Sequence, residues 1–323
     1  MKLCFTSDLH GDKQLYTQLV DLIHRERPDI LLLGGDQCHT VTGDSAIEEQ
    51  QVWLLTEFRR FLEEIRPVCR IFWTSGNHDL AGNLPAVTEL QCQNLITNCD
   101  LQPVDLGEDI SLLGFPFGPV NGWPYRDWER LDTDQSLPLK QYPQSFLTVN
   151  GRMDQVRTDD YFRSLPRLAD LLDESLRQVQ GNHILLLSHY PPYGINLDLS
   201  SCGHQIGCRK LREVLPSSDI TMVCSGHVHE APYLTGCWYK TIGPTLCVNP
   251  GQLGEKLHAL LIRTEDIQES LVHTVFGNYE DSDIPRYSAE EMRRVLEQRW
   301  KSDRTTPLNQ KKKLLSWIGS LLR

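Results

Sequence analysis

Five short apolar runs in this chain are each followed by polar residues with metal-ligand chemistry. The runs have the length and the bounding turns that are typical of buried β-strands. Each run has Asp, Asn or His just beyond its carboxyl end. In chain order, the runs and the residues after them are Lys2–Ser7 with Asp8-Leu9-His10, Ile30–Leu33 with Gly34-Gly35-Asp36, Ile71–Ser75 with Gly76-Asn77-His78-Asp79, His183–Ser188 with His189, and Ile220–Ser225 with Gly226-His227-Val228-His229.

Apolar residues at helical spacing separate these runs. Leu15, Leu19, Leu22 and Ile23 share one face of a helix predicted over 13–25. Further helices are predicted from Asp44 or Ser45 to Arg66, over 84–98 and over 164–178, and a strand is predicted over 109–115. Short runs between 236 and 276 predict antiparallel strands that complete a second sheet. This alternation of strands and helices indicates an α/β fold with helices covering the sheet.

The polar residues after the five runs predict one shared site. In α/β sheets, ligands bind beyond the carboxyl ends of the strands, where loops present side chains to one crevice. Oxygen and imidazole ligands without thiolate suit manganese, iron or zinc. The set is too large for a single metal ion.

The same motifs, in this order, resemble the calcineurin-like metallophosphoesterase family. The resemblance covers residues 8 to 229 and implies a four-layer α-β-β-α sandwich of two mixed sheets flanked by helices. It also implies two metal ions, one held by Asp8, His10, Asp36 and His229 and the other by Asp36, Asn77, His189 and His227. By the same resemblance, Asp36 bridges the two ions, His78 is the general acid that faces the substrate, and Asp79 orients the ring of His78.

The composition limits the functions that the chain can have. Its 323 residues carry a formal net charge of −11, which disfavours nonspecific nucleic-acid binding because that needs a positively charged surface. The ten cysteines form no Cys-x-x-Cys pair, and we expect reduced thiols. Asp8 and His10 lie so close to Met1 that a cleaved signal peptide would remove them, so we expect a cytoplasmic protein. No run reaches the ~20 apolar residues of a membrane span.

Two irregular stretches hold candidate substrate contacts. The first, 116–150, is rich in proline and aromatic residues, and long insertions of this kind are often functional. We expect it to form a rim over the metals, the alternative being that its aromatic side chains hold a surface loop in place. The second is the loop 193–207 and the short helix after it. The candidates are Trp123, Tyr125, Arg126 and Trp128 in the first stretch, and His204 and Arg209 in the second.

The C-terminal part of the chain differs in composition from the rest. We expect a catalytic domain over 1–276 and a helical extension over 277–323. Ser288 and Glu291 predict a capping box for a helix that runs to Trp300. Residues 308–323 contain three lysines followed by Leu, Trp and Ile on one helical face. This tail is expected to lie on a membrane surface, to contact a partner or to fold back on its own domain.

These features favour a phosphodiesterase that acts on a small phosphodiester such as a cyclic nucleotide. Protein phosphatases of the family usually carry Gly-Asn-His-Glu and Gly-Asp-x-x-Asp-Arg-Gly, whereas this chain has Asp79 and the sequence Gly35-Asp36-Gln37-Cys38-His39-Thr40. Three alternatives remain open at this point: a membrane-associated hydrolase of lipid-linked phosphoesters, a nuclease, and a non-catalytic metal-binding scaffold. The last expects missing ligands, and none is missing.

Overall fold

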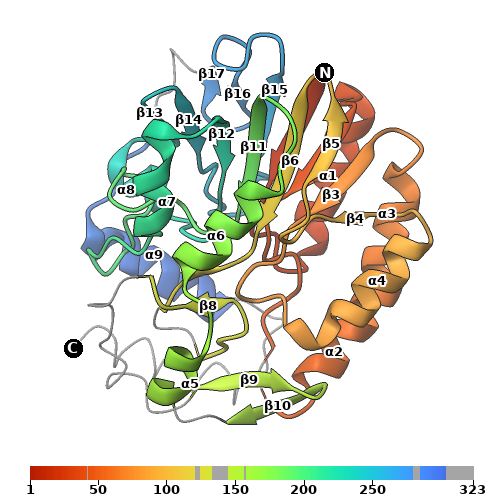
Figure 1. The fold of residues 1–323 in the computed structure, drawn as a ribbon, viewed down its shortest axis with the longest axis vertical. Coiled ribbons are helices and arrows are strands. Elements are labelled where there is room, and N and C mark those ends of the chain that lie inside the picture. Colours follow the sequence, from red (N-terminus) through yellow and green to blue (C-terminus); the bar gives the residue numbers. More distant parts are fainter. Residues whose placement is uncertain (42, 121–123, 133–144, 156–157, 279–283, 303–323) are drawn as a thin grey trace.

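Two large β-sheets form the centre of the protein (Figure 1). The computed structural model describes residues 1–323 except 42, 121–123, 133–144, 156–157, 279–283 and 303–323. The first sheet has the strand order β17-β16-β15-β1-β2-β3-β4, and the second has the order β13-β14-β12-β11-β6-β5. Both sheets mix parallel and antiparallel pairs, as predicted.

The first sheet contains three of the five predicted ligand-bearing strands, side by side and parallel. Its strands are β1 Lys2–Thr6, β2 Ile30–Leu33, β3 Arg70–Trp73, β4 Thr97–Asn98, β15 Leu260–Arg263, β16 Val272–His273 and β17 Gly277–Asn278. The strand β15 pairs antiparallel with β1, with Lys2 opposite Arg263. The expectation that all strands between 236 and 276 complete the second sheet is therefore wrong for β15 and β16, because β15 pairs with β1 and β16 pairs with β15.

The second sheet contains the other two ligand-bearing strands, β11 and β12, which are parallel neighbours. Its strands are β5 Val104–Gly107, β6 Ile110–Phe115, β11 His183–Ser188, β12 Ile220–Cys224, β13 Tyr239–Ile242 and β14 Thr245–Val248. The hairpin β13–β14 joins this sheet through parallel pairing of β14 with β12. The carboxyl ends of β11 and β12 therefore lie at one edge of this sheet.

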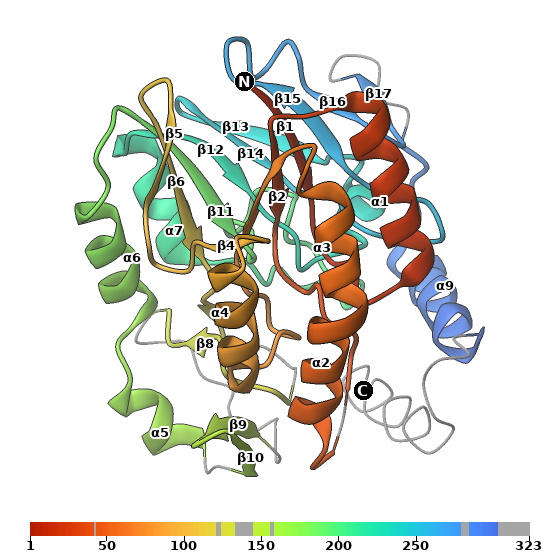
Figure 2. The same ribbon diagram turned by 90° about the vertical axis from the view of Figure 1, so that its right-hand side faces the viewer.

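Helices cover the outer faces of both sheets. Figure 2 shows α1, α2 and α3 on one side, α6 and α7 on the other, and the sheets between them. The helices are α1 Lys13–Glu26, α2 Ala46–Trp53, α3 Arg59–Ile65, α4 Leu84–Cys92, α5 Thr158–Ser164, α6 Leu168–Arg177, α7 Arg209–Val214, α8 Ala231–Thr235 and α9 Ala289–Ser302, with short 3-10 turns at Ala81–Asn83 and Leu215–Ser217. This arrangement confirms the predicted four-layer sandwich.

Alternate residues of each strand enter different hydrophobic cores. Leu3 and Phe5 of β1 pack between the two sheets, whereas Cys4 packs against the helices of the first face. In the second sheet, Leu185 faces the other sheet and Leu186 faces α6 and α7. Full burial of one such leucine contributes about 1.5–3 kcal/mol. Strands that are buried on both faces explain why the runs are continuously apolar rather than alternating.

Two predicted helices differ from their expected form. The helix expected up to Arg66 exists, but a π-helical turn at Leu54–Phe58 separates α2 from α3. The helix expected over 84–98 ends at Cys92, because Thr97–Asn98 pairs with β3 as strand β4. Pairing with a neighbouring strand satisfies the backbone of that segment in place of a helix.

The segment between β6 and α6 contains two small sheets and a short helix. It holds β7 Gly118–Pro119, β8 Glu129–Arg130, β9 Phe146–Val149 and β10 Arg152–Gln155, followed by α5. The strand β7 pairs with β8, and β9 pairs with β10. The described part of the predicted insertion is thus ordered.

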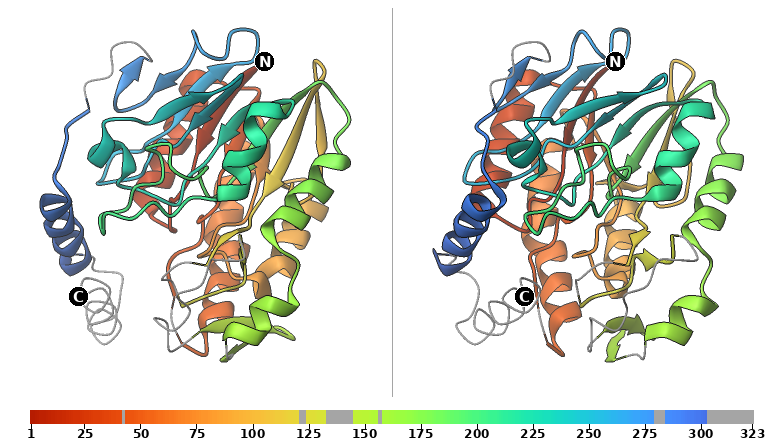
Figure 3. Two further views of the ribbon diagram at one scale, coloured as in Figure 1. Left: turned by 60° about the vertical axis from the view of Figure 1, so that its left-hand side comes forward. Right: turned by 90° about the vertical axis from the view of Figure 1, so that its left-hand side faces the viewer.

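The helix α9 begins with the predicted capping box. The Ser288 N–H donates to Glu291 Oε2 at 2.7 Å, and the Glu291 N–H donates to Ser288 Oγ at 3.2 Å. The backbone N–H of Tyr287 donates to the Tyr233 carbonyl in α8 at 3.0 Å, and Met292 is fully buried. Figure 1 places α9 on the same side as α8, and Figure 3 shows it at the periphery. The tail 308–323 lies outside the described residues. Among the described helices, none is long and apolar enough to cross a bilayer.

Candidate metal centre

All seven predicted ligands come together where the carboxyl ends of five strands meet. Asp8 and His10 follow β1, Asp36 follows β2, Asn77 follows β3, His189 follows β11, and His227 and His229 follow β12. Hydrogen bonds between the loops fix their relative positions. The N–H groups of Asp8 and His10 donate to the carbonyls of Gly35 and Asp36, each at 3.0 Å. Both sheets therefore contribute to one centre.

Four of these residues have a left-handed backbone. The φ angles are +62° for Asp8, +47° for His10, +52° for Asp36 and +65° for His227. Positive φ is uncommon for residues other than glycine, and such strain gathers at functional sites. The turns direct these side chains into the centre at a conformational cost that the surrounding fold must offset. The apolar pattern of the sequence does not predict these left-handed backbone conformations.

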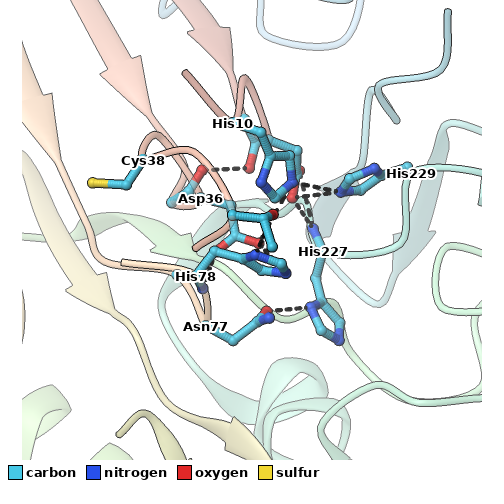
Figure 4. Close-up of polar contacts among 12 residues, drawn as sticks. His10, Asp36, Cys38, Asn77, His78, His227 and His229 are labelled. Carbon is cyan, nitrogen blue, oxygen red and sulfur yellow. Dashed lines mark hydrogen bonds and ion pairs between the residues drawn. The ribbon is translucent and has the colours of Figure 1, made fainter. Parts of the chain in front are cut away.

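Asp8, His10 and His229 form a first set of donor atoms. His229 Nε2 lies 3.1 Å from Asp8 Oδ1 and 3.2 Å from His10 Nε2. The Asp8 carboxylate also accepts the His227 N–H, at 3.1 Å to each of its oxygens. Figure 4 shows His229 and His10 converging from different strands. These three ligand atoms lie within 4.8 Å of one another.

A second set of donor atoms is built around Asn77. Its Oδ1 lies 3.0 Å from His189 Nε2 and 2.7 Å from His227 Nδ1. The other nitrogen of His189, Nδ1, donates to the Gly34 carbonyl at 2.9 Å. Such a bond fixes the tautomer and leaves Nε2 as the ligand atom, as is usual for histidines at metal sites.

Asp36 lies between the two sets. Its Oδ2 is 3.4 Å from His189 Nε2, 3.8 Å from His10 Nε2 and 3.9 Å from His78 Nε2. Its Oδ1 accepts the His78 N–H at 2.7 Å, which holds the carboxylate in place. One carboxylate is thus within reach of the donor atoms on both sides.

The centre carries buried negative charge. Burial alone would raise the pKa of Asp8, but His229 lowers that pKa to about 2. Burial is likewise opposed at Asp36, whose pKa lies well below its usual range because of His189 and His78. Burial would lower the pKa of His189, yet Asp36 raises it to about 9. Both carboxylates therefore stay ionised, and in the protein alone the His189 imidazolium offsets part of their charge.

This donor set fits divalent cations. Two buried ionised carboxylates a few ångströms apart need a positive counter-charge. The ligand atoms are oxygen and imidazole nitrogen, which suit manganese, iron and zinc. The nearby thiol of Cys38 is buried and points away from the centre in Figure 4. We find no thiolate ligand among the described residues of the centre.

Two glycines allow the loops to approach this closely. A Cβ atom on Gly76 would lie 2.3 Å from Asp36 Oδ1, and one on Gly226 would lie 2.2 Å from Asp8 Oδ2. Any side chain at either position would displace a carboxylate. The glycines of the Gly-Asn-His-Asp and Gly-His-Val-His motifs thus serve the packing of the centre itself.

The sequence predicted that Asp79 orients the His78 ring, and the structure places another residue, Thr40, beside a nitrogen of that ring. The Asp79 oxygens accept the backbone N–H groups of Cys38 and Gly76, each at 2.9 Å. The hydroxyl of Thr40 instead lies 2.8 Å from Nδ1 of His78. Burial, together with the nearby Asp36, raises the pKa of Asp79 to about 7. Asp79 thus joins the loops after β2 and β3, and its role in orienting the His78 ring stays a prediction.

The described residues of 116–150 do not form the expected rim of exposed side chains. Tyr125, Arg126 and Trp128 are at most 7% exposed. Arg126 pairs with the buried Glu129 at 2.5 Å, and Trp128 Nε1 donates to the Asp79 carbonyl at 2.5 Å. The prediction rested on the length and irregularity of the insertion, because such insertions are often functional. In the structure, these three side chains are buried within the protein.

The remaining predicted contacts lie elsewhere. His204 is exposed in its loop. Arg209 lies at the start of α7, with its guanidinium 3.5 Å from the centre of the Tyr193 ring. Trp123 lies outside the described residues. No described contact joins His204 or Arg209 to the centre.

Sequence reasoning missed three residues that position the centre. They are Thr40, Gln50 and Asp100. Asp100 accepts the hydroxyls of Thr74 and Ser75, at 2.6 Å and 2.7 Å, just before the Gly-Asn-His-Asp turn. Each is an isolated polar residue outside the motifs, and no local pattern distinguishes it from a surface residue.

Together, the sandwich and its buried oxygen and imidazole ligands define a metal-dependent hydrolase. The comparisons with known proteins give the family. The sequence model of the family of calcineurin-like phosphoesterases matches residues 1–231 of this chain. The chain belongs to this family, and it is a metal-dependent phosphoesterase. None of the curated proteins matches the chain.

Solved structures share the fold at low sequence identity. In one match, 84% of this chain aligns with 98% of the other at a TM-score of 0.56 and 15% identity. The protein TT1561 of Thermus thermophilus aligns with a TM-score of 0.50 and 13% identity, over 81% of this chain and 93% of its own. A novel archaeal phosphodiesterase aligns with a TM-score of 0.40 and 12% identity, over 84% and 99%.

Proposed function

We propose that the protein is a dinuclear phosphodiesterase that acts on a small phosphodiester, such as a cyclic nucleotide. The observation that carries this proposal is the position of Asp36 between two separate sets of donor atoms. Asp8, His10, Asp36 and His229 would hold one ion, and Asp36, Asn77, His189 and His227 the other. When bound, such ions polarise phosphoryl oxygens and lower the pKa of water to near neutrality.

His78 is the proposed general acid. Its side chain is 12% exposed, and its Nε2 points toward Asp36 and the centre. Burial, opposed in part by Asp36, lowers the pKa of His78. The ring would protonate the leaving oxygen through Nε2. General acid catalysis of this kind typically contributes about 10²–10⁴ in rate.

The substrate class follows from charge and access. The imidazoles of His10 and His229 are 22% and 25% exposed, so the centre is open on one face. A chain with net charge −11 supplies little attraction for a polynucleotide, which favours a small substrate over a nucleic acid. The lipid-linked alternative depends on the tail 308–323, outside the described residues, and gains no support here.

A substrate panel with three metals tests the proposal. The purified chain is loaded with Mn²⁺, Fe²⁺ or Zn²⁺ and assayed with bis-p-nitrophenyl phosphate, cyclic nucleotides and matched monoesters. We expect diesters to be preferred and about two ions to be bound per chain. Preference for monoesters throughout, or a single bound ion, would contradict the proposal.

Two variants separate metal binding from proton transfer. His78→Ala is expected to keep both ions and to lose most turnover, by about 10²–10⁴. Asp36→Ala is expected to lose metal as well, measured by elemental analysis after gel filtration. Loss of general acid catalysis should slow substrates with poor leaving groups more than those with good ones. If His78→Ala hydrolysed both kinds of substrate equally well, the assignment of His78 would be wrong.

A further inference from the structure

The two ring nitrogens of His78 have different neighbours. Nδ1 lies 2.8 Å from the hydroxyl of Thr40, on the loop after β2. Nε2 lies 3.9 Å from Asp36 Oδ2, on the side of the metal centre. A ring held at Nδ1 presents Nε2 in one direction. Thr40 therefore contacts the ring at the nitrogen that does not face the metal centre.

We propose that Thr40 is a positioning residue, whose hydroxyl holds His78 so that Nε2 faces the leaving group. This inference rests on the proposed role of His78 as the general acid. In the step itself, the N–H bond at Nε2 breaks and an O–H bond forms on the leaving oxygen. The proton at Nδ1 stays in place and donates to Thr40 Oγ1 before and after the transfer.

A hydroxyl suits this position because the nearby carboxylates already accept hydrogen bonds from backbone N–H groups. Both oxygens of Asp79 accept backbone N–H groups. Asp36 accepts the His78 N–H and faces the ligands. The chain thus assigns the Nδ1 side of the ring to an uncharged oxygen that both donates and accepts.

The distance between Thr40 and His78 is fixed by the buried side chain of Gln50. Its Nε2 donates to the carbonyl of His39 at 3.0 Å and to that of His78 at 2.6 Å. Its Oε1 accepts the N–H of Leu80 at 3.2 Å. One amide from α2 therefore ties together the two loops that carry the hydroxyl and the ring.

A double-mutant cycle tests whether Thr40 acts through His78. Thr40→Val, Thr40→Ser, His78→Ala and Thr40→Val/His78→Ala are compared on a diester with an alkyl leaving group and on one with a 4-nitrophenyl leaving group. We expect Thr40→Val to lower kcat for the alkyl ester by about 10–100-fold with KM within about twofold, because misplacement by about 1 Å costs up to this much. The 4-nitrophenyl ester needs less acid catalysis and should lose less.

Three readouts distinguish positioning from a general structural effect. Thr40→Ser should restore kcat to within about threefold of the wild type, because it restores the hydroxyl. In the His78→Ala background, Thr40→Val should have no further effect, since coupled residues are not additive. Metal content should stay at the wild-type value in both Thr40 variants. Additive losses, failure of the serine variant or loss of metal in Thr40→Val would each overturn the inference.

Thr245→Val is the matched control. The Thr245 hydroxyl is fully buried at the start of β14, away from the centre, and donates to the Ile220 carbonyl at 2.6 Å. Its loss should lower the melting temperature and leave kcat unchanged. If the wild type hydrolyses no diester, the proposed function fails, and the same cycle is then run on phenyl and 4-nitrophenyl phosphate. An additive cycle in that case still overturns the role of Thr40 alone.

Discussion

His273 is a buried histidine whose hydrogen bonds require a neutral ring. Its Nε2 donates to the Pro250 carbonyl at 3.0 Å, and its Nδ1 accepts the N–H groups of Val275 and Phe276 at 3.0 Å and 3.2 Å. Burial, with His258 nearby, lowers the pKa of His273 to about 3. Protonation of Nδ1 would place a donor against two donors. The neutral tautomer is thus built into the fold.

Stability should therefore fall in acid because of His273. In the unfolded chain a histidine has a pKa of about 6.5, so between about 6.5 and 3 the unfolded state binds a proton that the folded state excludes. The stabilising contribution is present above this window and is lost as the pH falls through it. We expect His273→Gln, which cannot titrate, to lose less stability than the wild type between pH 7.5 and 4.5.

Urea unfolding at the two pH values measures this difference. The other ionisable groups are common to both proteins, so their contributions cancel in the comparison. An equal loss of unfolding free energy in wild type and variant would show that His273 does not couple to pH.

At the scale of elements, the segment between β6 and α6 supports the centre from outside. Trp128 donates to the carbonyl of Asp79, and Asp127 Oδ2 accepts the N–H of Ala81 at 2.8 Å. Both bonds hold the chain just after the Gly-Asn-His-Asp turn. The segment is anchored by the fully buried pair of Arg126 and Glu129.

Arg126→Met is expected to affect stability and not substrate affinity. It removes the positive charge that pairs with the buried Glu129 carboxylate, and breaking a buried pair in this way costs about 3–5 kcal/mol. KM and kcat per folded molecule should stay within about twofold of the wild type, measured at a temperature where the variant is folded. The control is Arg263→Met, whose ion pair with Asp266 is solvent-exposed, so that its loss should change stability little. A raised KM in Arg126→Met would return Arg126 to the substrate site.

The strands and their ligands could be predicted from the sequence because both signals are local. Buried parallel strands give continuous apolar runs, and the ligands follow within a few residues of each run, as in Gly226-His227-Val228-His229. The position of β15 beside β1 could not be predicted, since the paired residues Lys2 and Arg263 lie at opposite ends of the sequence. Thr40 and Gln50 escaped detection because only the folded loops bring them to His78.

For the whole molecule, the metal centre joins two separate sheets. Asp8, His10, Asp36 and Asn77 come from the first sheet, and the three other histidines come from the second. Bound cations would therefore connect layers that otherwise meet through the apolar core between them. Ligands that bind only the folded state stabilise it in proportion to the logarithm of their concentration.

Divalent metal is expected to raise the melting temperature of the protein. At one hundred times the dissociation constant, one bound ion contributes about 2.7 kcal/mol. For a chain of this size we expect a rise of roughly 4–5 °C for each bound ion, reversed by a chelator. Differential scanning calorimetry of the metal-free and metal-loaded chain measures it. Asp36→Asn should show little shift, and a full shift in that variant would place the bound metal elsewhere.

The π-helical turn at Leu54–Phe58 has a consequence for how the chain tolerates length changes. It adds one residue to the helical path between Gln50, which reaches the loops, and α3, which packs on the first sheet. Each residue of a helix turns the chain by about 100°. A π-turn accommodates its extra residue over about the same rotation as an ordinary turn, so deleting one residue here is expected to regularise the helix and to leave Gln50 and α3 in nearly the same relative orientation. A deletion within α2 or α3 would instead rotate Gln50 away from His78.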